Sequence, residues 1–182
     1  MLSWNGGRNM KRNWLRIAIA SFLVLSLAAC SASTEDQTAK GIKEAKEIFQ
    51  GEPAEPKEQI GNVELFVPGG FSIQEESDET NIVLVDKSNS YILFINPNEQ
   101  QDSHLFYDLL QSEKKDVIFA EETFEQNGRF GFVAVISTGE EQTFEIMTSI
   151  GGVKMTTLSD KNDISKNMKQ MMKIVRSVKI AE

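Results

Sequence analysis

The sequence predicts an α+β fold in which a mainly antiparallel sheet is covered by helices on both faces, an α/β/α sandwich. Segments of alternating or continuous apolar residues are separated by short turns rich in Gly, Asn and Pro, which is typical of strands joined as hairpins. Two other stretches repeat apolar residues every three or four positions, as helices do. The order along the chain is four strands, a helix, four strands and a helix. Continuous apolar strands require a covering layer on each side.

Before this fold, the chain has the pattern of an export signal. Residues 17–29 are thirteen residues with two polar interruptions, Lys11, Arg12 and Arg16 lie shortly before them, and residues 1–30 contain no acid. Thirteen helical residues span only about 20 Å, short of a bilayer core of roughly 30 Å. The pattern therefore favours a cleaved signal peptide over a permanent transmembrane helix. Met10, followed by two basic residues, is an alternative start of this signal.

The signal ends in Leu27-Ala28-Ala29-Cys30, which resembles the lipobox of bacterial lipoproteins. The resemblance implies cleavage between Ala29 and Cys30, a diacylglyceryl group on the Cys30 sulfur, and anchoring on the extracytoplasmic face of the cell membrane. Two acyl chains, at about 0.8 kcal/mol per buried methylene, would make that anchor essentially permanent. Cys30 is the only cysteine, so no disulfide is expected. The composition favours a Gram-positive-type envelope.

Residues 30–60 are expected to form the lipidated N-terminus and a polar tether, and residues 61–182 a single α+β domain. The tether is rich in Ser, Thr, Glu, Lys and Gln, and Pro53 and Pro56 lie near its end. Within it, apolar residues at helical spacing predict a short amphipathic helix over about 37–50. The sequence leaves open whether this helix packs on the domain.

The first half of the domain is predicted to hold four strands and a helix. Alternation predicts strands at 63–67 and 71–73, on either side of Pro68-Gly69-Gly70. Unbroken apolar runs at 82–85 and 91–95 predict strands that are covered on both faces. An apolar stripe then predicts a helix over about 100–114.

The second half repeats the pattern. Strands at 117–124 and 130–137 flank Asn127-Gly128, the strongest short signal for a hairpin. Strands at 142–150 and 153–158 follow, joined at Gly151-Gly152. A last helix begins after Asp160 or Asp163, and a short strand at 178–180 closes the chain. Three methionines of that helix either fill the core or form an adaptable contact surface; they are Met168, Met171 and Met172.

The body resembles the fold shared by the photosystem accessory protein PsbP and DcrB-type bacterial lipoproteins. The resemblance lies in the segments VELFVPGGFSI, NIVLVDKSNSYILFIN and NMKQMMKIVRSVKI, and in the order of elements over about residues 61–180. Members of this group are mostly non-catalytic accessory or binding modules. The resemblance therefore implies partner binding, and it carries over no functional residue.

Charge narrows the possible partners. After cleavage before Cys30 the chain would hold fifteen Lys and Arg against twenty-seven Asp and Glu, a net charge of −12. Such acidity argues against nucleic acid as a partner. The last helix departs from this acidity by carrying a basic stripe of Lys166, Lys169, Lys173 and Arg176. The stripe either contacts an anionic polymer or lipid headgroups, or is simply a solvated face.

No residue pattern indicates catalysis. His104 is the only histidine, and its sequence neighbours Ser103 and Asp102 do not face it on a helix, so a triad is not expected. The acidic groups around residues 75–79, 121–125 and 140–141 lack the spacing of a calcium loop. We expect no cofactor and no metal. The sequence thus favours a non-catalytic lipoprotein that binds an envelope protein, with a small-molecule, ion or anionic-polymer binder as the alternative and a hydrolase last.

Overall fold

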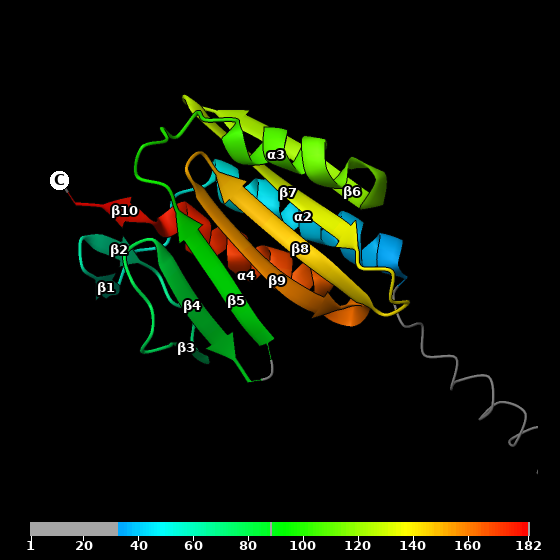
Figure 1. The fold of residues 1–182 in the computed structure, drawn as a ribbon, viewed down its shortest axis with the longest axis horizontal. Coiled ribbons are helices and arrows are strands. Elements are labelled where there is room, and N and C mark those ends of the chain that lie inside the picture. Colours follow the sequence, from blue (N-terminus) through cyan, green and yellow to red (C-terminus); the bar gives the residue numbers. More distant parts are fainter. Residues whose placement is uncertain (1–32, 88, 182) are drawn as a thin grey trace, which may run out of the picture. The chain divides into compact units, whose positions relative to one another are not determined.

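The computed structural model describes residues 33–87 and 89–181; the signal peptide, Ala29 and Cys30 lie outside this part of the chain. Its main element is a seven-stranded sheet with the order β3-β4-β5-β9-β8-β7-β6, in which every neighbouring pair is antiparallel (Figure 1). The strands are β3 (Phe71–Ile73), β4 (Asn81–Asp86), β5 (Asn89–Ile95), β6 (Ile118–Gln126), β7 (Arg129–Ser137), β8 (Thr143–Ile150) and β9 (Val153–Asp160).

Helices lie on both faces of this sheet. Helices α2 (Thr34–Gln50) and α4 (Ile164–Ser177) cover one face, where α4 packs on β8 and β9 and α2 packs on α4, β6 and β7. Helix α3 (Leu105–Lys114) lies on the other face, over the side chains of Phe132 and Ala134. The α+β class with an antiparallel sheet between helical layers is therefore confirmed.

A second, three-stranded sheet lies at one end of the body. It consists of β1 (Glu58–Ile60), β2 (Val63–Leu65) and β10 (Lys179–Ile180), with β2 in the middle. The short closing strand that the sequence predicted is thus present as β10. Strand β1 was not predicted, because three residues with two charged or amide side chains carry no strand signal.

Helix α2 belongs to the folded body. Ser33 caps it through a reciprocal pair of bonds: the Asp36 amide donates to Ser33 Oγ (3.1 Å) and the Ser33 amide donates to the Asp36 carboxylate (3.3 Å). Ala45 and Phe49 on its inner face are fully buried. The segment expected to be a tether over 30–60 therefore supplies a helix to the core.

The core between the two helices and the sheet is mainly apolar, and it encloses a buried polar group around Asn167. Met168, Met171 and Met172 are fully buried, so the methionine cluster fills the core. Among them, the Asn167 side chain accepts a hydrogen bond from the Tyr91 hydroxyl (2.9 Å) and donates one to Ser159 Oγ (2.8 Å). Burial raises the pKa of Tyr91, so this hydroxyl stays protonated and keeps its bond at neutral pH.

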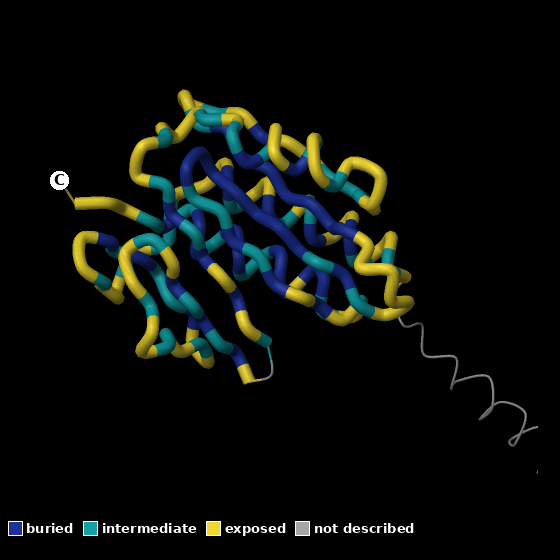
Figure 2. The backbone as a smooth tube through the Cα atoms, in the orientation of Figure 1, coloured by how far each residue is buried: buried dark blue, intermediate teal, exposed yellow. Residues whose placement is uncertain are grey.

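Strands β4 and β5 differ from the expectation. The sequence predicted cover on both faces, but only one set of their side chains is buried: Ile92 is 51% exposed, while Tyr91 and Leu93 on either side of it are fully buried. Strand β7 is buried on both faces at every residue from 130 to 136, and β8 at every residue from 146 to 150 (Figure 2). Within the described part of the chain, no helix has the length and apolar character needed to cross a membrane.

Candidate docking surface

One half of the sheet face that carries α3 lies open. Helix α3 packs over β7 and β8 through Phe106 and Leu110, which contact Phe130, Phe132 and Met147. A helix about 10 Å wide covers roughly two strands spaced about 4.8 Å apart. Phe94, near the end of β5, and Lys154, near the start of β9, still approach Phe106 of α3. Farther from α3 on the same face, Ile92 of β5 and Leu158 of β9 remain exposed.

Apolar side chains line the open half in a defined register. Val83 of β4 lies opposite Ile92 of β5, and Ile92 lies opposite Thr156 of β9. Leu158, two residues beyond Thr156 on the same face, is 60% exposed, the highest value among the large apolar side chains of the described chain. We call this set the open-face patch; it comprises Val83, Val85, Ile92, Thr156 and Leu158.

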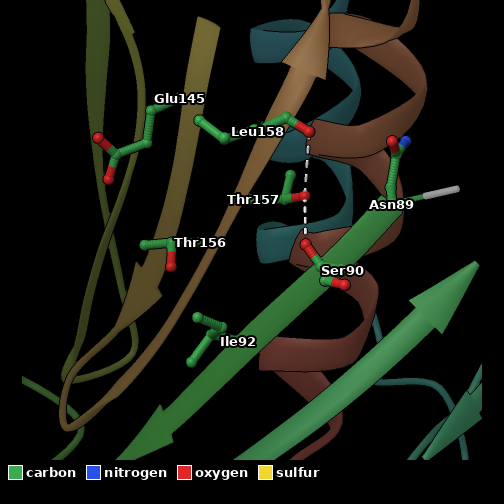
Figure 3. A pocket seen from close by; sticks show the side chains of 7 residues that line it. All are labelled: Asn89, Ser90, Ile92, Glu145, Thr156, Thr157 and Leu158. Carbon is green, nitrogen blue, oxygen red and sulfur yellow. Dashed lines mark hydrogen bonds between the residues drawn. The ribbon is translucent and has the colours of Figure 1, made fainter. Parts of the chain in front are cut away.

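The patch surrounds a shallow hollow of about 380 Å³, drawn in Figure 3. Its lining comprises Ile92, Thr156 and Leu158 of the patch together with Asn89, Ser90, Glu145 and Thr157. The Thr157 hydroxyl donates to the Ser90 carbonyl (2.7 Å) and joins β9 to β5 at this point (Figure 3). A flat, pre-formed apolar surface of this kind buries well against another protein surface.

The wall toward α3 is charged. Lys114, in the last turn of α3, forms an ion pair with Glu145 of β8. Lys154 of β9 lies over the rings of Phe94 and Phe106, with its ammonium 5.7 and 4.9 Å from their centroids. Burial lowers the pKa of Lys154. The open-face patch is thus an apolar area bordered on one side by fixed charges, as the rim of a protein interface is.

The basic stripe predicted on the last helix is largely engaged within the molecule. Lys169 pairs with Glu44 of α2 at 3.0 Å, and hydrogen bonds from Lys169 and Ser165 lower the Glu44 pKa against the opposing effect of burial. Lys166 pairs with Asp86 at 3.5 Å. Arg176 donates to the Phe49 and Gly51 carbonyls at the end of α2 (3.3 and 3.4 Å). Of the four, Lys173 alone has neither an ion pair nor a side-chain hydrogen bond to another described residue. Lys169 and Arg176 attach α2 to α4, and Lys166 joins α4 to β4.

Of the residues weighed for chemistry, Asp102, His104 and Glu125 line one hollow beside the turn between β6 and β7. The exposed His104 ring stacks on Phe130 at 3.7 Å, and the neighbouring Ser103 hydroxyl donates to Glu99 (2.5 Å). Asp78 accepts bonds from the Asn81 and Thr80 amides (2.8 Å each), and these bonds lower its pKa. Within residues 33–87 and 89–181, no three His, Cys, Asp or Glu side chains are grouped as metal ligands.

The open-face patch was missed at the sequence level. Unbroken apolar runs at 82–85 and 91–95 were interpreted as strands covered on both faces, so Ile92 was expected to be buried. In the structure its side chain is exposed. The sequence does hold one signal: a single ten-residue helix separates the two groups of strands, and one helix cannot cover a face of seven strands.

Comparison with known proteins adds one structural likeness. No protein-family model matches the chain, and no curated protein matches its sequence. The solution structure of cyanobacterial PsbP (CyanoP) from Synechocystis sp. PCC 6803 is similar, with a TM-score of 0.41 and 8% identity over 65% of this chain and 86% of that one. That protein belongs to the fold group that the sequence resembles.

Proposed function

We propose that this chain is a lipoprotein anchored through Cys30 to the extracytoplasmic face of the cell membrane, and that its body binds a protein of the envelope without catalysing a reaction. The anchor rests on the lipobox and the basic, acid-free signal ahead of it. A Gram-positive-type envelope is the setting that the composition favours. The binding function rests on the open-face patch.

The observation that carries the binding proposal is the accessibility of two large aliphatic side chains on neighbouring strands. Ile92 is 51% and Leu158 is 60% exposed, on a sheet whose backbone positions are fixed by hydrogen bonds. Single exposed apolar residues are ordinary, but a contiguous group on a rigid, flat surface is typical of a contact site. A protein partner is favoured over a small molecule, because the hollow is shallow and open.

The alternative, binding of an anionic polymer or lipid headgroups through Lys166, Lys169, Lys173 and Arg176, has less support. Lys169 and Lys166 already face carboxylates, and Arg176 already donates to backbone carbonyls. Releasing Lys169 and Arg176 to a ligand would cost contacts that hold α2, and releasing Lys166 would cost its ion pair with Asp86 of β4. A hydrolase has the least support, because His104 stacks on an aromatic ring and faces no nucleophile in the described structure.

Site-specific photo-crosslinking in the living cell tests the proposed docking. A photoreactive residue at Leu158, in the full chain expressed in its own host, should yield a discrete adduct with one envelope protein. The same residue at Leu109, an exposed leucine on the outer side of α3, is the matched control and should not yield it.

A second substitution in the same chain tests whether the partner binds at the open-face patch. Ile92→Asp buries a charge in the contact and should lower the yield of the Leu158 adduct about tenfold or more, the result of losing at least roughly 1.4 kcal/mol of binding. An adduct pattern that is the same at both leucines, or that Ile92→Asp leaves unchanged, would refute docking at the open-face patch.

A further inference from the structure

The distance along the chain from the proposed lipid anchor to the folded body is very short. Helix α2 begins at Thr34 and is capped by Ser33, and only Ser31 and Ala32 separate Ser33 from Cys30. Three Cα–Cα steps of at most about 3.8 Å place the Cys30 Cα within about 11 Å of the Ser33 Cα, whatever path the chain takes. A flexible tether of about thirty residues would instead reach about 30 Å on average.

The start of α2 marks one end of the body, which we call the anchor end. A hollow there is lined by Thr34 and Glu35 of α2, Phe119 of β6, Phe144 of β8 and the turn between β7 and β8. Phe119 is 41% exposed, and its ring lies 5.6 Å from the buried ring of Phe144. An accessible aromatic side chain therefore lies beside the first turn of α2.

The opposite end of the body lies far from the start of α2. Helices α2 and α4 run side by side in the same direction, since Gly41 lies against Ser165 near the start of α4 and Phe49 lies near Arg176 at its end. The fourteen residues of α4 span about 21 Å. Strand β10 follows, and its Ile180 is 42% exposed. Figure 1 shows the start of α2 (blue) and β10 (red) at opposite ends of the body.

We infer that the short link holds the anchor end against the membrane surface, with the Phe119 ring in the lipid headgroup region and β10 turned away from the membrane. The inference rests on the proposed lipidation of Cys30. Its partner is the bilayer surface itself, because a body attached within about 11 Å of an acylated residue cannot move its attached end away from the headgroups. Aromatic side chains favour that depth.

The carboxylates at the anchor end should make this contact depend on the charge of the lipids. Glu35, Glu140 and Glu141 line the hollow around Phe119. Carboxylates are repelled by an anionic lipid surface, and the repulsion weakens beyond a Debye length of about 8 Å at physiological salt. The contact is therefore imposed by the link and not by electrostatic attraction, and it should be closer on zwitterionic than on anionic bilayers.

Tryptophan fluorescence tests this orientation cleanly. The two tryptophans of the chain, Trp4 and Trp14, precede Cys30, so the mature lipoprotein would contain none. Phe119→Trp and Ile180→Trp each place a single reporter at positions of matched exposure, 41% and 42%. Each variant is expressed from the full gene, purified as the membrane-bound form and reconstituted into phosphatidylcholine vesicles with or without a spin label on the headgroup.

The spin label should quench roughly half of the emission of the Phe119→Trp protein and almost none of that of the Ile180→Trp protein, because only the first reporter lies at headgroup depth. Replacing most of the lipid by phosphatidylglycerol should reduce the quenching of the first, and added salt should restore it. Equal quenching of the two proteins, or stronger quenching of the Ile180→Trp protein, would overturn the inference.

A third variant isolates the role of the link. Inserting a Gly/Ser spacer of about twelve residues between Ala32 and Ser33 gives a reach of roughly 20 Å and should abolish the quenching of the Phe119→Trp protein. Unchanged quenching would contradict the claim that the short link imposes the contact. The mass of the purified protein shows which proposal has failed. A chain without lipid refutes both the proposed lipid anchor and this inference. A lipidated chain whose two Trp variants are quenched equally refutes the inference alone.

Discussion

Phe49→Ala should lower the free energy of unfolding by about 3–5 kcal/mol, the usual loss for a fully buried phenylalanine. The Phe49 side chain is 0% exposed, and its ring lies 5.5 Å from that of Phe124. The ring also fills the space that Gly131 leaves: a Cβ at Gly131 would lie 2.8 Å from a carbon of the Phe49 ring. Removing the ring would therefore leave a cavity between α2 and strands β6 and β7.

Urea denaturation followed by far-UV circular dichroism measures this loss. Phe119→Ala is the matched control, because it removes the same side chain at a position that is 41% exposed, and it should cost less than about 1 kcal/mol. If Phe49→Ala were as mild as the control, α2 would be a detachable part of the tether. The short link between Cys30 and the body would then have no structural basis.

Gly151→Ala should destabilise the protein by about 2–4 kcal/mol, because it combines backbone strain with a steric clash. Gly151 has a φ of +50°, and a Cβ there would lie 2.3 Å from the Gln100 carbonyl oxygen. The clash falls where the loop after β5 is fixed, since the Gly151 amide donates to the Phe130 carbonyl and the Phe130 amide to the Gln101 carbonyl (2.9 Å each). Relieving the clash would therefore displace the loop after β5, the turn between β8 and β9, and the start of β7.

Gly139→Ala separates the cost of backbone strain from the cost of the steric clash. Gly139 also has a positive φ (+85°), but nothing lies within 4 Å of its built Cβ, so this substitution tests the strain alone and should cost about 1–2 kcal/mol. Thermal unfolding of both variants provides the comparison. Equal losses for the two glycines would mean that the loop does not pack against the turn between β8 and β9 as described.

The turns explain why so much of the fold could be predicted from the sequence. Asn127 and Gly128 both have positive φ, +53° and +68°, as the favoured two-residue hairpin turn requires, and the strands on either side of them are β6 and β7. The predicted helix over 100–114 begins only at Leu105, because the residues before it form turns whose amides bond to backbone carbonyls within the loop. Local chemistry determined each of these features.

Features that depend on distant partners could not be predicted in the same way. The basic stripe has the spacing of a solvated helix face, but Glu44, which pairs with Lys169, lies 125 residues away in the sequence. The packing of α2 likewise depends on Gly41, which brings the helix within reach of Met168. The exposure of Ile92 depends on where α3 ends in space. Such contacts have no periodic signature in one sequence.

We propose above all that a lipid on Cys30 holds the protein at the membrane, and the intact mass of the protein extracted from membranes of its own host tests this most directly. We expect a chain that begins at Cys30 and carries the added mass of a diacylglyceryl group, which disappears in Cys30→Ala. A chain that still contains residues before Cys30 and has an unmodified thiol would contradict it.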